Sequence, residues 1–194
     1  GMLVLKRLED AERDGDNIYS VIKGIGTSSD GRFKSVYAPR PSGQAMAMER
    51  TYEDAGYGAD TVGLIEAHGT GTGAGDAAEL TSMNMVFGKN NSKKQHIALG
   101  SVKSQVGHTK AAAGSAGMVK AALALHHKIL PHTINVDKPS TKVNIEDTAM
   151  YVNTEARPWL RNGHPRRASV SAFGFGGINV HITMEEYQGK KRSD

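Results

Sequence analysis

Short runs of aliphatic and β-branched residues, each ended by glycines or polar residues, recur along the chain and predict β-strands. The last two runs are joined by a tight Gly-Phe-Gly-Gly turn, so we expect these two strands to pair. The charged segment 9–16 predicts a turn or a one-turn helix. The predicted strands cover residues 2–8, 18–25, 61–68, 96–102, 168–173 and 178–184.

Segments between these runs carry apolar residues at helical spacing and predict α-helices. The first covers 42–56, where Ser42 is a suitable N-cap. The second covers 76–88, where Asp76 is expected to cap the helix. Glu79, three residues later, has the position that a capping box requires.

A third helix is predicted over 109–128, with Thr109 as its N-cap. Its first half is almost entirely Ala, Gly and Ser. Each glycine inside a helix costs about 1 kcal/mol relative to alanine. A close approach by another element would offset that cost, so we expect this helix to be central and buried.

Strands and helices alternate through the middle of the chain, and strands follow one another at its end. This order predicts an α/β layered fold with a mixed sheet and a buried Ala/Gly-rich helix. A chain of 194 residues is long enough for one domain with a sizeable core.

Composition narrows the class of protein further. Hydrophobic residues make up 38% of the chain, the mean hydropathy is -0.43, and the apolar runs are too short to span a bilayer. No signal-peptide pattern is present at the N-terminus, so a cytoplasmic location is expected. The absence of cysteine excludes disulfides, thiolate metal sites and a cysteine nucleophile within these residues.

The net charge of +4 does not indicate a nucleic-acid binder, because the basic residues do not cluster along one helix or face. The dense basic clusters are Arg166-Arg167 and 190–192. Residues 188–194 are predicted to form a disordered basic tail, so the folded part would be 1–187.

The candidate chemistry lies in loops that each follow a predicted strand. His68 follows the strand over 61–67, Lys103 and His108 follow the strand over 96–102, and Phe175 follows the strand over 168–173. Sites in open α/β sheets gather beyond the carboxyl ends of the strands. We therefore expect these side chains to converge, where a cation and two imidazoles would stabilise an oxyanion or enolate.

The loop after His68 alternates glycines with Thr70 and Thr72, an arrangement suited to an extended polar substrate arm. It does not match a phosphate-binding loop, because it lacks the Lys-Ser/Thr ending and the dinucleotide spacing. A metal held by His68 and His108 is a weaker alternative, since no third ligand has a usual spacing. The remaining histidines read as structural, including His181 in the last strand.

Three segments carry a resemblance to a known family: "EAHGTGT…GDAAEL", "GSVKSQVGHTKAAAG" and "SAFGFGGINVHI". In this order they resemble the C-terminal part of β-ketoacyl synthases, the condensing enzymes of fatty-acid and polyketide synthesis. The resemblance extends over about 3–187 and implies a thiolase-like fold. The stretch "SSDGRFKSVYAPRPSGQAMAM" further resembles iterative type I synthases, such as those for polyunsaturated fatty acids.

The resemblance implies roles for the catalytic candidates. His68 and His108 match the two histidines of a Cys-His-His set, which assist decarboxylation of a malonyl unit and stabilise the enolate and oxyanion. Lys103 matches the family's lysine, which pairs with an acid that Glu79 matches. That pairing competes with the capping box predicted for Glu79.

The resemblance also implies how substrate is held. Thr70 and Thr72 match threonines that bind the phosphopantetheine arm of an acyl carrier protein, and no other cofactor or metal is implied. A glycine-hinged gate beside the acyl pocket corresponds to Phe173, Gly174, Phe175, Gly176 and Gly177. Gln105 and Ile178 depart from the family, where Asn and Thr are common, which affects expectations for substrate preference and loop geometry.

The family's nucleophilic cysteine belongs to an N-terminal half that these residues do not include. We therefore expect an acyltransferase fragment that is inactive alone, and an exposed apolar face where that half would pack. The resemblance implies as partners an acyl carrier protein and either the N-terminal half of the ketosynthase or a second copy of this chain. It does not imply binding to nucleic acid or to a membrane. The alternative is a non-catalytic ketosynthase-like or carrier-docking protein, although such proteins tend to lose the histidines that this sequence keeps.

Overall fold

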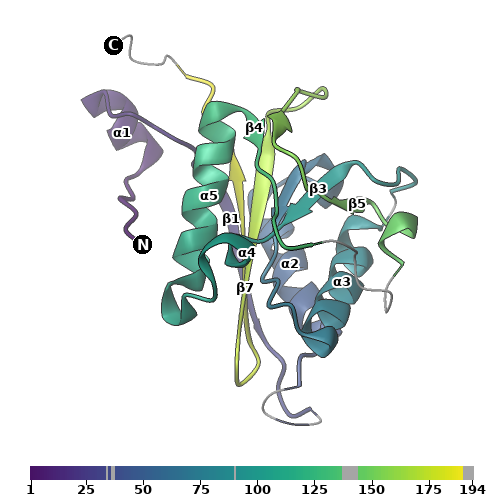
Figure 1. Cartoon of the computed structure of the whole chain (residues 1–194). Coiled ribbons are helices and arrows are strands. Elements are labelled where there is room, and N and C mark those ends of the chain that lie inside the picture. The colour runs from purple at the N-terminus through teal and green to yellow at the C-terminus, as the bar shows by residue number, and fades with distance from the viewer. Residues whose placement is uncertain (34, 36–37, 90, 137–143, 190–194) are drawn as a thin grey trace.

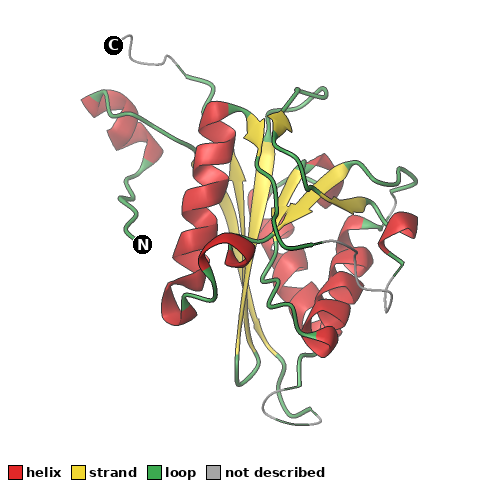
Figure 2. Ribbon diagram, in the orientation of Figure 1, coloured by secondary structure: helices red, strands yellow, loops and turns green. Residues whose placement is uncertain are grey.

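A computed structural model shows a central mixed β-sheet covered by helices on both faces (Figures 1 and 2). The structure describes residues 1–33, 35, 38–89, 91–136 and 144–189. Most of the predicted basic tail, 190–194, lies outside these residues. The sheet strands are β1 (Val21–Ser29), β2 (Leu64–Glu66), β3 (Ile97–Gly100), β5 (Met150–Val152), β7 (Arg167–Gly174) and β8 (Ile178–Glu185).

The order of strands in the sheet is β1-β8-β7-β2-β3-β5. β2 runs parallel to both β3 and β7, and β3 runs parallel to β5. β8 runs antiparallel to β7, as expected for two strands joined by a tight turn. It also runs antiparallel to β1 on its other side. The carboxyl ends of β2, β3 and β7 therefore meet at one edge of the sheet, which confirms the mixed α/β fold.

One face of the sheet is covered by α2 (Pro41–Ala55) and α3 (Gly73–Phe87), which lie side by side to the right of β7 in Figure 1. Met48 and Phe87 are fully buried in this layer, together with Ile65 of β2. Alternate residues of the short parallel strands face opposite layers, so Leu64 belongs instead to the core on the other side.

Three predicted helix N-caps are wrong, among them Thr109, because the N-cap of the Ala/Gly-rich helix is Ala112. Arg40 is the N-cap of α2, and Pro41 occupies its first turn, where the missing N–H of proline costs nothing. Ser42 is therefore already inside the helix. α3 begins one turn earlier than predicted, with Thr72 as its N-cap, so Asp76 lies in the first turn.

The Ala/Gly-rich helix is confirmed as α5 (Ala113–His127), preceded by a 3-10 turn over Lys110–Ala112. A Cβ at Gly117 would lie 2.9 Å from Val170 Cγ1, so the glycine permits the close approach between α5 and β7. The predicted burial holds for one face only. The opposite face is partly exposed, and Leu123 on it is 41% exposed.

The strand predicted over 2–8 is wrong. Residues 1–7 have no regular structure, and α1 (Leu8–Asp14) follows them, standing apart from the sheet in Figure 1. Met2 and Val4 are about 90% exposed. A strand requires a neighbour for its backbone hydrogen bonds, and the described residues provide none for this segment.

The second predicted strand is present but displaced, as β1 begins at Val21 and continues to Ser29. The polar turn after β3 contains a single helical turn, α4 (Lys103–Val106). A separate two-stranded sheet, without a sequence prediction, pairs β4 (Ile129–Leu130) with β6 (Arg157–Pro158). Short 3-10 turns cover Ala59–Thr61 and Ile145–Asp147.

Candidate active site

The predicted convergence holds in part: the three loops leave one edge of the sheet, but Lys103 borders one cavity whereas His68 and Phe175 border the next. His68 lies two residues beyond β2, α4 with Lys103 follows β3, and Phe173 lies near the end of β7. Because β2 is parallel to both neighbours, these loops leave the same edge of the sheet. His108 joins them from the turn between α4 and α5.

The two candidate imidazoles face each other edge to face. The ring centroids of His68 and His108 are 5.6 Å apart, with an interplanar angle of 85°. Phe173 packs beside His68 at a centroid distance of 5.7 Å. Both histidines border a cavity of about 830 Å³, which Thr70 and Thr72 also line.

Hydrogen bonds to the backbone define the tautomer of both rings. His68 Nδ1 accepts a bond from the N–H of Phe173 at 3.4 Å, and His108 Nδ1 accepts one from the N–H of Lys110 at 3.0 Å. A ring nitrogen that accepts carries no proton, so each neutral imidazole is protonated on Nε2. Both rings therefore carry an Nε2–H donor.

Their surroundings keep both imidazoles neutral near pH 7. Burial, followed by the positive charge of Lys103, lowers the pKa of His68 to about 4. Burial and the same lysine also lower the pKa of His108, although its side chain is more exposed. Burial lowers the pKa of Lys103 too, against the opposing charges of Glu79 and Glu66.

Glu79 supports the loop that carries His68, but not as predicted. Its carboxylate accepts the backbone N–H groups of His68 at 2.7 Å and Gly69 at 2.8 Å, so the capping-box prediction is wrong. Burial raises its pKa to about 7, which these bonds oppose. No ion pair within 4.0 Å joins it to Lys103 in the described part of the chain, so the pairing implied by the resemblance is not formed.

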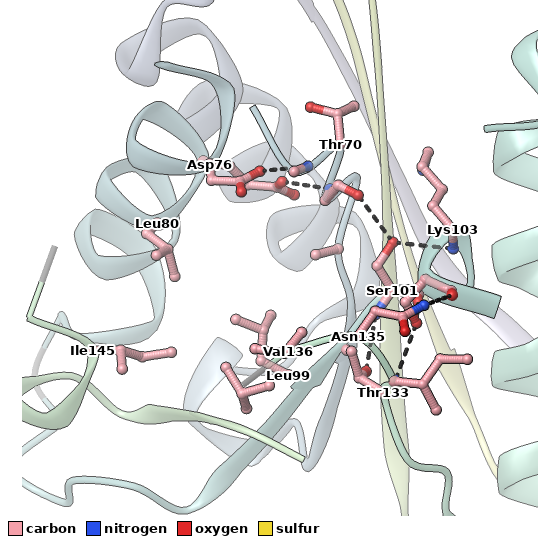
Figure 3. Close-up of a pocket in the computed structure, with 18 of the residues that line it drawn as sticks. Thr70, Asp76, Leu80, Leu99, Ser101, Lys103, Thr133, Asn135, Val136 and Ile145 are labelled. Carbon is pink, nitrogen blue, oxygen red and sulfur yellow. Dashed lines mark hydrogen bonds between the residues drawn. The ribbon is translucent and has the colours of Figure 1, made fainter. Parts of the chain in front are cut away.

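Lys103 borders a second cavity, of about 760 Å³, next to the first. Figure 3 shows Asp76 and Leu80 of α3 on one side of this cavity, with Ser101 and Lys103 on the other. Thr70, Glu79 and His108 border both cavities, so the two spaces share the wall formed by the His68 loop.

The predicted gate residues lie at the end of β7 and on the turn that leads to β8. Phe173 and Gly174 are the last residues of β7, whereas the Phe175 side chain is 80% exposed at the tip. Gly176 and Gly177 have φ values of 89° and 78°, which disfavour other residues there. The first cavity is bordered by all of the predicted gate residues except Gly176.

The threonines of the glycine-rich loop lie next to each other. The hydroxyl oxygens of Thr70 and Thr72 are 3.1 Å apart, and Thr72 is exposed at the cavity. Asp76 fixes the same loop, because its Oδ1 accepts the N–H of Gly71 at 3.2 Å.

Sequence reasoning missed a buried ion pair behind the site, between Glu66 of β2 and Lys120 of α5. A carboxylate inside a run of aliphatic residues was the available signal, because such a group is rarely buried without a partner. In the described residues no group of three or more His, Cys, Asp or Glu side chains is placed to hold a metal ion. The helices found there are also too short or too polar to cross a membrane.

The fold agrees with comparisons to known proteins. Residues 19–137 match the model of the β-ketoacyl synthase C-terminal domain, and 139–194 match that of the ketoacyl-synthetase C-terminal extension. The chain belongs to the β-ketoacyl synthase family.

Relatives come from multidomain synthases. The chain is 50% identical over 191 residues to one subunit of the polyunsaturated fatty acid synthase of Thraustochytrium, covering 95% of this chain and 7% of that protein. It is 48% identical over 196 residues to the polyketide synthase PksL of Bacillus subtilis, covering 100% of this chain and 4% of that protein.

Solved ketosynthases share the thiolase-like fold. The ketosynthase from module 6 of the Bacillus subtilis bacillaene synthase superposes with a TM-score of 0.91 at 45% identity, covering 95% of this chain and 33% of that one. Ketosynthase twelve of the bacillaene synthase in Bacillus amyloliquefaciens gives 0.91 at 36% identity, covering 94% and 33%. This chain therefore spans about a third of a ketosynthase and a small part of the synthases that contain one.

Proposed function

We propose that this chain supplies the histidine and lysine part of a condensing active site, which joins an acyl thioester to a malonyl thioester with loss of CO₂. The observation that supports the proposal is that Nδ1 of both His68 and His108 accepts a backbone N–H, which leaves Nε2 of each ring to donate at one cavity. Residues 1–187 would form the C-terminal part of the ketosynthase.

The proposed reaction places negative charge on oxygen twice. When the malonyl unit loses CO₂, the electron pair of the broken C–C bond forms an enolate. The enolate carbon then attacks the acyl thioester, and the thiolate leaves as the tetrahedral oxyanion collapses. Donors that are already in place stabilise such charges without reorganisation, which suits neutral imidazoles and the ammonium of Lys103.

The malonyl unit would arrive on the phosphopantetheine arm of an acyl carrier protein. Thr70 and Thr72 support this, because their adjacent hydroxyls border the cavity that His68 and His108 share. The exposed Phe175 at the tip of the turn would gate the acyl side of the cavity.

The site requires residues from outside this chain. The acyl group needs a thiol nucleophile, and the chain contains no cysteine. Exposed apolar side chains, among them Met2, Val4 and Leu123, indicate surfaces that the rest of a ketosynthase would cover. We expect the isolated chain to be inactive in condensation and to self-associate, and a cytoplasmic location stays a prediction.

A chimera tests the function directly. In the bacillaene module 6 ketosynthase, the third that this chain matches would be replaced by this chain, which is 45% identical to it. We expect CO₂ release from a malonyl-loaded carrier and a β-ketoacyl product by mass spectrometry. His68→Ala and His108→Ala should each reduce condensation about 100-fold or more.

The matched control is His164→Ala, since His164 is exposed and borders neither cavity. This variant should keep the activity of the chimera. Condensation that survives both His68→Ala and His108→Ala would overturn the assignment of the two histidines.

A further inference from the structure

Glu66 and Lys120 form a buried ion pair that the proposed reaction does not use. The side chains are 2% and 9% exposed, and Glu66 Oε2 lies 2.8 Å from Lys120 Nζ. Neither atom has a hydrogen-bond partner in the part of the chain that the structure describes, so the ion pair is the polar contact that each makes there. Each charge therefore depends on the other.

The second carboxylate oxygen of Glu66 reaches a different segment. Glu66 Oε1 accepts the backbone N–H of Val102, directly before α4. A single carboxylate thus connects β2, the turn after β3 and helix α5. These three elements carry or adjoin the groups of the candidate site, because His68 lies two residues after Glu66 and Lys103 directly follows Val102.

We propose that Glu66 and Lys120 are positioning residues, which fix the Val102 N–H and thereby hold the turn after β3 opposite the histidine that follows β2. The inference rests on the proposed function for its consequence in catalysis. The contacts on which it depends are independent of that function.

The surrounding backbone is shaped to admit this pair. A Cβ at Gly117 would lie 3.1 Å from Glu66 Cγ, closer than side-chain atoms normally approach. The glycine on α5 therefore leaves room for the Glu66 side chain.

Stability alone does not explain such a pair. Desolvation of two buried charges commonly offsets their attraction, and apolar replacements of similar volume are often neutral or stabilising. Burial raises the pKa of Glu66, and the charge of Lys120 opposes that rise. What an apolar pair could not supply is an acceptor for the Val102 N–H.

Two double variants of the full 194-residue chain separate the acceptor from the charges. Glu66→Gln with Lys120→Met removes both charges and keeps an oxygen that can accept from Val102. Glu66→Leu with Lys120→Met removes both charges and the acceptor. Amide hydrogen exchange at Val102, ring-to-ring contacts between His68 and His108 by NMR, and thermal unfolding would be measured for both.

We expect the Val102 amide to exchange at least about tenfold faster in the leucine variant than in the glutamine variant, because a hydrogen-bonded amide exchanges only on opening. Contacts between the two imidazoles should weaken in the leucine variant only. Equal exchange and equal ring contacts in the two variants would overturn the proposal, whatever their melting temperatures.

If the leucine variant does not fold, amide exchange at Val102 in the single variant Lys120→Met tests the proposal. Releasing the carboxylate should accelerate Val102 exchange several-fold, and an unchanged rate would overturn the role of Lys120. In the chimera, the leucine variant should lower kcat with KM unchanged relative to the glutamine variant. If the unaltered chimera showed no condensation while the Val102 amide still exchanged at different rates in the two double variants, the proposed function would be refuted. The positioning role of Glu66 and Lys120 would still be supported.

Discussion

Histidines inside the sheet and histidines at its edge differ in what their ring nitrogens contact. His181 in β8 is fully buried, with Nδ1 3.0 Å from the Ser171 hydroxyl and Nε2 3.3 Å from the Tyr52 hydroxyl. His68 and His108 each accept a hydrogen bond through Nδ1, and no described residue forms a hydrogen bond with Nε2 of either ring.

The number of ring nitrogens that already have a hydrogen-bond partner distinguishes imidazoles with a structural role from imidazoles that can contact substrate. A ring with both nitrogens satisfied cannot take another partner without breaking a bond. A ring held by one nitrogen is oriented, and its other nitrogen can reach substrate. Burial alone does not make this distinction, because it lowers the pKa of both His68 and His181.

The largest effect should follow from His181→Ala. This change removes a fully buried ring and leaves the hydroxyls of Ser171 and Tyr52 without this partner. We expect the free energy of unfolding to fall by about 3–5 kcal/mol, measured by urea denaturation. If the free energy of unfolding fell by less than about 1 kcal/mol, His181 would not have the structural role assigned to it here.

Acid should weaken the fold through the same residue. Burial lowers the pKa of His181 to about 3, whereas an unfolded histidine titrates near 6.5, so the unfolded state binds the proton first. Stability from this group is fully present above about pH 6.5 and is lost as the pH falls toward 3. We expect a loss of about 3 kcal/mol by pH 4, reduced in His181→Ala.

A smaller effect is expected from Glu79→Leu. Two backbone N–H groups, of His68 and Gly69, would lose their acceptor at a buried position. Unfolding should become easier by about 2 kcal/mol, and Glu79→Gln should recover part of it because one oxygen remains. Equal stability of the two variants would argue against a role for these bonds.

The smallest effect on stability should come from the site itself. His108 is exposed and His68 is half-buried, so His68→Ala and His108→Ala should each cost less than about 1 kcal/mol. Calorimetry alongside the chimera assay would check this. A large decrease in the free energy of unfolding of either variant would contradict this expectation, because a loss of activity could then result from unfolding.

Hydrophobic patterning predicted the elements whose partners lie within this chain. β2, β3, β7, β8, α2, α3 and α5 all appear close to their predicted places, because their apolar faces meet one another. The strand predicted over 2–8 failed for the same physical reason, since its pattern requires a neighbouring strand that the described residues do not supply.

The site was predicted in outline and missed in detail. Parallel strands brought His68, Lys103 and His108 to one edge, which follows from topology. Spacing could not show that Glu79 bonds to the backbone after β2 and not to Lys103, or that Glu66 reaches Val102. Those choices depend on tertiary packing, which sequence distance does not encode.

Nitrogen-15 NMR of the histidine rings at pH 7 would show directly which ring nitrogen of His68 and His108 carries a proton. We expect His68 and His108 both to be neutral, with the proton on Nε2, and both to have a pKa below that of an ordinary histidine. A proton on Nδ1 of either ring, or a pKa above 7, would contradict it, because the two rings could not then offer paired neutral donors to one oxyanion.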